Sequence, residues 1–220
     1  MTRGITNGDT MAQQQGATMA QGRRGPMRIA ALAAVSAGAM LLAGCISFGP
    51  KVPDQLISLT PTASAPAGDL PTLGAAPPIV VLDPETEREI DVLRVPVKVS
   101  NSGIAYVKDA AWIAKPARQF RALLAETLRA QGRRMVLEGL DSQGGDRAVL
   151  SGRLLDMGYD TARGGIVVRY DALLTQPGGA IKARRFEAVV PGVTATGAAV
   201  GPALNQAAND VAGQVAAWVG

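Results

Sequence analysis

The apolar residues of this chain recur at two spacings, and the helical spacing is clearest in two segments. One segment begins near Pro116, a residue suited to a first helical turn, and ends at Gly132. Its apolar face carries Phe120, Leu123, Leu124, Thr127 and Leu128. The second segment closes the chain and begins near Thr196 or Gly197, with Pro202 expected in its first turn. Its stripe consists of Val200, Leu204, Ala208, Val211, Val215 and Trp218.

Extended structure is predicted where apolar residues alternate with polar ones or form short continuous runs. The expected strands are residues 55–59, 79–82, 94–99, 103–107, 133–137, 148–159, 166–174 and 181–190. The glycine pairs Gly144-Gly145, Gly164-Gly165 and Gly178-Gly179 separate the later segments and favour an antiparallel meander. Residues 60–78 are rich in proline and are expected to form a loop.

These elements predict an α+β fold in which two helices pack on a mixed, mostly antiparallel sheet. Residues 55–220 are enough for one domain with a substantial core. Aromatic residues make up 4% of the chain, so valine, leucine, isoleucine and alanine must fill most of that core.

An apolar run precedes this domain and indicates export. Residues 29–42 are apolar or small, follow Arg23, Arg24 and Arg28, and are too few to span a bilayer as a helix. The run ends in Leu41-Leu42-Ala43-Gly44-Cys45, which resembles the bacterial lipobox. We therefore expect residues 1–44 to be a signal peptide, with translation starting at Met1 or at Met27.

The lipobox resemblance implies cleavage between Gly44 and Cys45 and attachment of lipid to Cys45. Two or more acyl chains hold a protein stably on a membrane. Residues 45–54 would then be a tether. Because Ile46 rather than aspartate follows Cys45, the expected location is the periplasmic face of the outer membrane of a Gram-negative cell.

Charge gives little support for nucleic-acid binding. Four basic residues and one acidic residue precede Cys45, so a chain beginning there has 18 basic and 17 acidic residues. With no basic excess and no long basic run, nucleic acid is not an expected partner.

The residue inventory excludes several kinds of catalysis. The chain contains no histidine, which rules out Ser-His-Asp and Cys-His triads and any zinc site that needs histidine. No G-x-S-x-G, S-x-x-K or phosphate-binding glycine motif occurs after Cys45. We expect no metal and no cofactor other than the covalent lipid.

Three groups of residues remain as candidate sites. Asp160 and Asp171 flank the hairpin at Gly164-Gly165 and could form an acid/base pair, although turn hydrogen bonds or ion pairs with Arg163 and Arg169 are favoured. The acidic residues within 83–91 could bind a cation, although a solvated loop is favoured. Tyr106 and Trp112 could form an exposed patch for a partner protein, although burial of Trp112 is favoured.

Several short sequences together resemble the ABC-type transport auxiliary lipoprotein family, specifically its PqiC/YmbA-like group. Besides the lipobox, they are Leu59-Thr60-Pro61, Ile104-Ala105-Tyr106, Pro116-Ala117-Arg118, Leu150-Ser151-Gly152-Arg153-Leu154, Gly158-Tyr159-Asp160 and Val168-Arg169-Tyr170-Asp171-Ala172. The resemblance extends from about Cys45 to the end of the chain. It implies a domain similar to the N-terminal domain of TolB and supplies no catalytic residues.

The function implied by this resemblance is non-enzymatic. Members of the family are associated with MCE-domain proteins and ABC permeases with their ATPases, which move lipids between the two membranes. The expected role is to dock the MCE conduit to the outer membrane, with a homo-oligomeric ring around the conduit as a further hypothesis. The alternatives are an assembly or scaffold lipoprotein that does not handle lipid, and an enzyme that uses Asp160 and Asp171.

Overall fold

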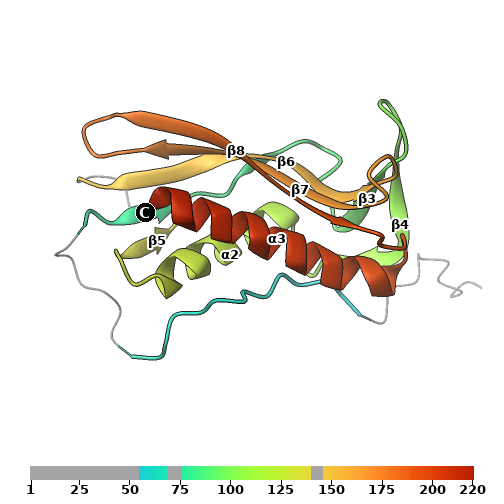
Figure 1. Cartoon of the computed structure of the whole chain (residues 1–220), viewed down its shortest axis with the longest axis horizontal. Helices are drawn as coiled ribbons and strands as arrows, with labels where there is room; N and C mark the ends of the chain where they lie inside the picture. The colour runs from blue at the N-terminus through green and yellow to red at the C-terminus, as the bar shows by residue number, and fades with distance from the viewer. Residues whose placement is uncertain (1–54, 69–75, 140–145) are drawn as a thin grey trace, which may run out of the picture. The chain divides into compact units, whose positions relative to one another are not determined.

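The computed structural model describes residues 55–68, 76–139 and 146–220, all of which belong to one compact unit, Lys51–Gly220. The strands are β1 (Ile79–Val81), β2 (Glu85–Thr86), β3 (Arg94–Lys98), β4 (Ile104–Ala111), β5 (Val136–Glu138), β6 (Ala148–Asp160), β7 (Gly165–Thr175) and β8 (Ile181–Pro191). The helices are α2 (Pro116–Ala130) and α3 (Gly197–Val219). The expected α+β fold is confirmed (Figure 1).

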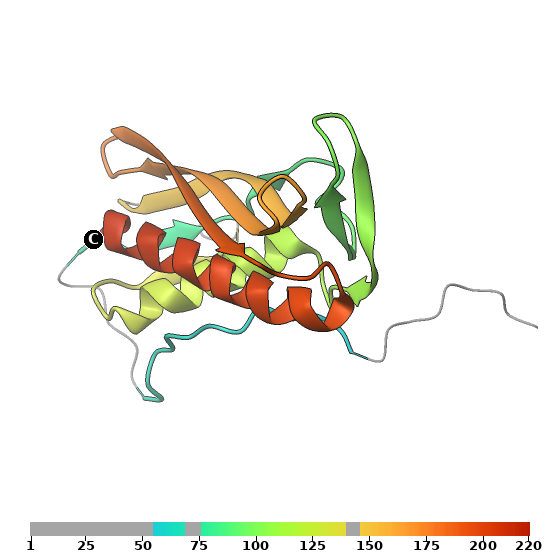
Figure 2. The same ribbon diagram turned by 45° about the vertical axis from the view of Figure 1, so that its right-hand side comes forward.

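The long strand β6 organises the sheet. One edge of β6 pairs antiparallel with β7, which pairs antiparallel with β8. The other edge of β6 pairs in parallel with β1, β2 and β3 in turn. Beyond these strands, β5 pairs in parallel with β1, and β4 pairs antiparallel with β3. The predicted meander is therefore confirmed for β6, β7 and β8, with turns at Gly164-Gly165 and Gly178-Gly179 (Figure 2). Gly144 and Gly145 lie outside the described residues.

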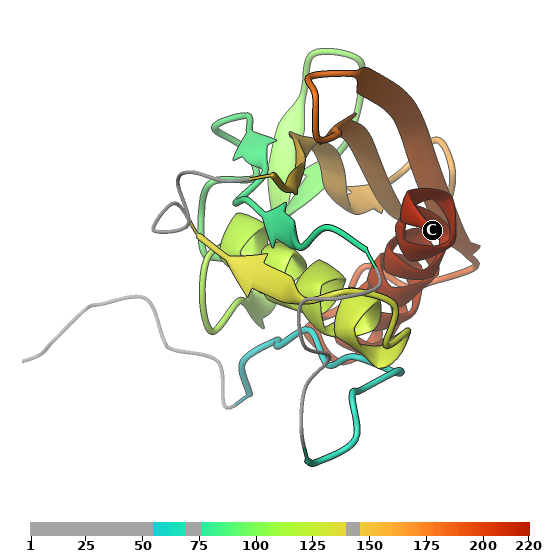
Figure 3. The ribbon, with the colours of Figure 1, turned by 90° about the vertical axis from the view of Figure 1, so that its left-hand side faces the viewer.

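Both helices cover the same face of the sheet (Figures 1 and 3). Phe120 of α2 meets Tyr170 of β7 edge-on, with ring centroids 5.3 Å apart. On the neighbouring strand β8, Phe186 is the register partner of Tyr170, and Trp218 of α3 packs edge-on against it at 5.6 Å. The predicted apolar faces of the two helices thus form the core between helices and sheet, and Trp218 has the packing role that its position suggested.

The helix boundaries follow the sequence signals, with one correction. Pro116 occupies the first turn of α2, and Thr196 immediately precedes α3. Pro202, however, lies inside α3 rather than in its first turn, because the helix already begins at Gly197. Pro202 lacks the N–H that would otherwise bond to the carbonyl four residues earlier.

The strand predicted for residues 55–59 is wrong, since the segment makes a single bridge, between Ile57 and Trp112. Residues 57–65, which we call the strap, instead run along the two helices on the side away from the sheet (Figure 1). Ile57 and Leu59 are buried, while side chains of α2 and α3 bind the strap backbone. The predicted loop of residues 60–78 is free of helix and strand in its described parts.

Candidate functional site

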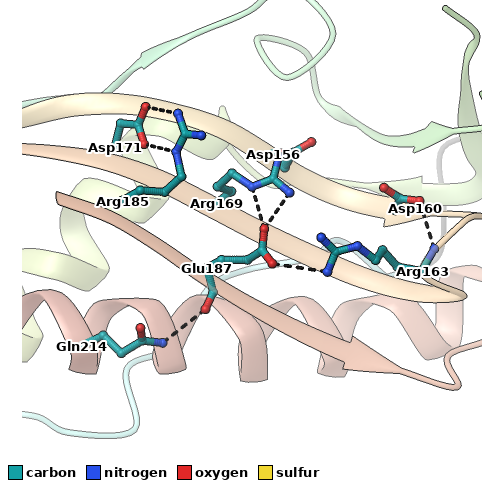
Figure 4. A network of polar contacts seen from close by, with 8 residues as sticks. All are labelled: Asp156, Asp160, Arg163, Arg169, Asp171, Arg185, Glu187 and Gln214. Carbon is teal, nitrogen blue, oxygen red and sulfur yellow. Dashed lines mark hydrogen bonds and ion pairs between the residues drawn. The ribbon is translucent and has the colours of Figure 1, made fainter. Parts of the chain in front are cut away.

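The face of β6, β7 and β8 that points away from the helices carries paired charges (Figure 4). Tyr170 is buried against the helices. Because side chains alternate along a strand, Arg169 and Asp171, which flank Tyr170, lie on the opposite face. We call it the outer face and define it by Arg153, Asp156, Arg169, Asp171, Arg185 and Glu187.

The outer-face charges are paired across neighbouring strands. Arg185 donates two hydrogen bonds to the Asp171 carboxylate, at 2.6 and 2.7 Å. Arg169 bridges two carboxylates, with 2.6 Å hydrogen bonds to Asp156 and to Glu187. Such cross-strand pairs fix the register of the three strands.

The pKa values of the carboxyl groups differ with their surroundings. The hydrogen bond from Arg185 lowers the pKa of Asp171, and the hydrogen bond from Arg169 lowers that of Glu187. Burial raises the pKa of Asp156, and this effect outweighs the opposing attraction of Arg169. Asp156 is consequently the outer-face carboxylate that is least well stabilised as an anion.

Asp156 also lines a cavity of about 230 Å³ beside the turn between β3 and β4. The cavity wall combines polar and apolar side chains, including Lys98, Asp160, Ile104 and Met157. Its lining could accept a small polar group.

Asp160 and Asp171 do not form an acid/base pair. The Asp160 carboxylate accepts hydrogen bonds from the backbone N–H groups of Ala162 and Arg163, at 2.8 and 3.1 Å, within the turn. Asp171 is paired with Arg185, and its register partner on β6 is Arg153. The favoured interpretation, local turn bonds and ion pairs, is confirmed, although Asp171 has a different partner from the arginines expected.

Three of the five acidic residues within 83–91 pair with basic residues. Glu87 binds Arg153 at 2.5 Å, Asp91 binds Lys115 at 2.9 Å, and Asp83 lies 3.1 Å from Arg121. Within the described ranges, no group of three or more carboxylate, cysteine or histidine side chains is arranged to hold a metal ion.

Tyr106 and Trp112 do not form an exposed patch together. Trp112 is 1% exposed and belongs to the core, which confirms the favoured interpretation. Tyr106 is half-buried, and the guanidinium of Arg94 lies 3.8 Å from its ring centre. Gly44 and Cys45 lie outside the described residues.

Sequence reasoning missed the residues that hold the strap. The Asn205 side-chain oxygen accepts a 2.7 Å hydrogen bond from Thr60 N–H, and that of Asn209 accepts one of 2.8 Å from Thr62 N–H. Gln119 of α2 accepts from Leu59 N–H at 2.9 Å. Two asparagines four residues apart, on one side of a helix made mostly of apolar and small residues, are the signal that could have indicated this role.

A second hollow, of about 830 Å³, lies at the start of α2. Leu93 and Ile113 line it, with exposed fractions of 50% and 60%. We call it the α2 groove. The α2 groove was not predicted, because alternation along the chain does not reveal which apolar side chains remain uncovered at the ends of strands.

Comparisons with known proteins establish a likeness of fold. No protein-family model matches the chain, and no curated protein matches it. A crystal structure of a DUF330 protein from Xanthomonas campestris is similar at a TM-score of 0.62 and 16% identity, over 75% of this chain and 94% of that one. A crystal structure of an uncharacterized protein is similar at a TM-score of 0.58 and 14% identity, over 76% of this chain and 100% of that one.

A third structure, the PelC dodecamer from Paraburkholderia phytofirmans, gives a TM-score of 0.41 at 18% identity, over 67% of this chain and 92% of that one. At these identities the comparisons concern the fold alone. Neither helix in the described ranges is both long enough and apolar enough to cross a membrane.

Proposed function

We propose that this chain is a non-enzymatic periplasmic lipoprotein of an MCE/ABC-type lipid transport system, anchored in the outer membrane. It docks the periplasmic conduit to that membrane. The observation that carries the proposal is the sequence Leu41-Leu42-Ala43-Gly44-Cys45 directly ahead of a single compact domain.

The state of the candidate catalytic residues supports a role without catalysis. Asp160 is committed to the turn that follows β6, and Asp171 to Arg185. A general acid or base must reach the proton that it transfers. The two carboxylates, bound to separate local partners, offer no joint site for a substrate.

We infer that the outer face is the surface that docks the MCE-domain protein. The strap, residues 57–65, lies over the helices on the side away from the sheet and therefore leaves the outer face uncovered. Paired charges on a polar surface favour specific and reversible contacts over a permanent apolar interface.

A crosslinking experiment tests this function. The acylated protein is crosslinked in cells and recovered from membranes, with Cys45→Ser as the unanchored control, and its partners are identified by mass spectrometry. We expect an MCE-domain protein and its ABC permease. Recovery of an outer-membrane barrel or an envelope scaffold alone would overturn the transport role in favour of an assembly lipoprotein.

Two charge reversals on β8 test the docking surface. Arg185→Glu changes the outer face, whereas Lys182→Glu changes an exposed residue on the other side of the same strand. We expect Arg185→Glu to reduce recovery of the MCE protein at least severalfold and Lys182→Glu to leave it unchanged. An equal effect of both reversals would exclude the outer face as the specific surface.

A further inference from the structure

Three exposed aliphatic side chains lie around the buried pair formed by Ile57 and Trp112. Ile57 N–H donates to the carbonyl of Ala111 at 2.7 Å, and Ile113 N–H donates to the carbonyl of Ile57 at 3.0 Å. Because neighbouring side chains in extended segments alternate, Leu56 and Ile113 point outward where Ile57 and Trp112 point inward. Leu56 is 45% exposed.

Leu93 completes this group from the other side of Trp112. Its carbonyl accepts a 2.8 Å hydrogen bond from Trp112 N–H, and it lines the α2 groove together with Ile113. We call Leu56, Leu93 and Ile113 the aliphatic patch. Covering exposed apolar area of this kind with another apolar surface is favourable, because it removes that area from water.

The charges around the patch do little to oppose such covering. Asp91 is neutralised by Lys115 at 2.9 Å, and Asp83 lies 3.1 Å from Arg121. Arg118 and Glu85, which also line the groove, bring one charge of each sign. The rim is therefore close to electrically neutral, and its contact would depend weakly on salt.

The patch lies where the chain enters the domain. Leu56 is the second described residue, and the expected tether of residues 45–54 spans at most about 35 Å when fully extended. A lipid on Cys45 would therefore keep the patch within reach of the bilayer surface. The turn between β7 and β8 lies at the opposite end of the domain, near the C-terminus (Figures 1 and 2).

We propose that the aliphatic patch contacts the phospholipid surface and holds this end of the domain against the membrane. This inference rests on the proposed lipid anchor. It adds a fixed orientation, in which the patch meets the lipid and the outer face stays free for a partner. The occupant of the patch is lipid, rather than a second protein.

Site-specific fluorescence tests the orientation. Single cysteines replace Leu56, Leu93 or Ile113 in the acylated protein, in which Cys45 carries lipid and is not labelled. Each carries an environment-sensitive dye and is placed on vesicles of phosphatidylethanolamine and phosphatidylglycerol, with or without a spin-labelled lipid quencher. Ile181→Cys is the matched control, since Ile181 is 62% exposed at the β7–β8 turn.

We expect at least a twofold rise in emission, and quenching by the spin-labelled lipid, at the three patch positions but not at Ile181→Cys. Equal responses at both ends, or no response at the patch, would overturn the orientation while the anchor stands. Circular dichroism confirms that each variant is folded. Lack of acylation at Cys45, measured separately by mass spectrometry, would overturn the anchor and this inference with it.

Discussion

The backbone N–H of Thr60 donates a 2.7 Å hydrogen bond to the side-chain oxygen of Asn205, 145 residues later in the chain. Asn205 also donates to the carbonyl of Ser58 at 2.8 Å, so one side chain binds both a backbone donor and a backbone acceptor of the strap. Asn209 repeats the arrangement with Thr62 N–H and the carbonyl of Thr60. The segment that follows the expected tether is thus fixed to α3 by its backbone.

Replacing these asparagines should loosen the strap. We expect Asn205→Ala and Asn209→Ala each to lower the free energy of unfolding by about 1 kcal/mol, because the hydrogen bonds are partly exposed and water replaces them. Hydrogen exchange at Thr60 and Thr62 should accelerate. Gln206→Ala, at the exposed neighbouring position, is the control, and equal acceleration in it would contradict the role of the asparagines.

Gly152 should be intolerant of any side chain. Its φ is +152°, and a Cβ there would lie 2.0 Å from the carbonyl oxygen of Asp171 and 2.8 Å from the Tyr170 hydroxyl. We expect Gly152→Ala to lower the free energy of unfolding by about 3 kcal/mol or more, measured by urea denaturation. Gly213→Ala, in α3 with no atom near its would-be Cβ, should instead stabilise by about 0.5–1 kcal/mol.

The pKa values of the outer-face carboxyl groups should depart from their ordinary values in opposite directions. Hydrogen bonds from arginines lower the pKa of Asp171 below 3.8 and that of Glu187 below 4.5, whereas burial raises the pKa of Asp156 above 3.8. At a pH above their ordinary pKa values, ionised Asp171 and Glu187 therefore stabilise the folded state. This stability is lost as the pH falls through their lower pKa values in the folded protein.

The effect of pH on stability through Asp156 has the opposite sign. Its ionisation weakens the fold as the pH rises from 3.8 through the higher folded pKa, because the folded state favours the protonated form. Carbon NMR of the carboxyl groups across an acid titration measures all three pKa values. An Asp156 pKa below that of Asp171 would contradict the described burial.

The burial of Trp112 can be measured in solution. In a Trp218→Phe variant, Trp112 is the remaining tryptophan of the chain. Because Trp112 is 1% exposed, we expect its emission to be blue-shifted relative to the unfolded chain and to resist quenching by iodide. Strong quenching in the folded protein would instead place Trp112 on the surface.

The sequence was most informative where local pattern and tertiary packing agree. Pro116 and the apolar spacing after it predict α2, since the buried stripe and the helix start are both local features. The strand expected at residues 55–59 failed for a physical reason. Its alternation is real, but only Ile57 bonds to the backbone beside β4, whereas the backbone of Ser58 and Leu59 bonds to the side chains of Asn205 and Gln119.

Other features depended on distant parts of the chain. β4 continues to Ala111, beyond the residues 103–107 expected, because Ala111 pairs with Arg94 across an irregular register. The short β2 has too few residues to show a pattern. Among the candidate site residues, local signals correctly favoured turn bonds for Asp160, whereas the exposure of Leu93 and Ile113 depended on the packing of several segments.

The central claim is that lipid on Cys45 anchors this domain to the outer membrane. Mass spectrometry of the N-terminal peptide, prepared from separated outer-membrane fractions, tests it most directly. The account predicts a chain that begins at Cys45 and carries acyl groups on that residue. A free Cys45 thiol within a longer chain, or a chain cleaved elsewhere and recovered without lipid, would contradict it.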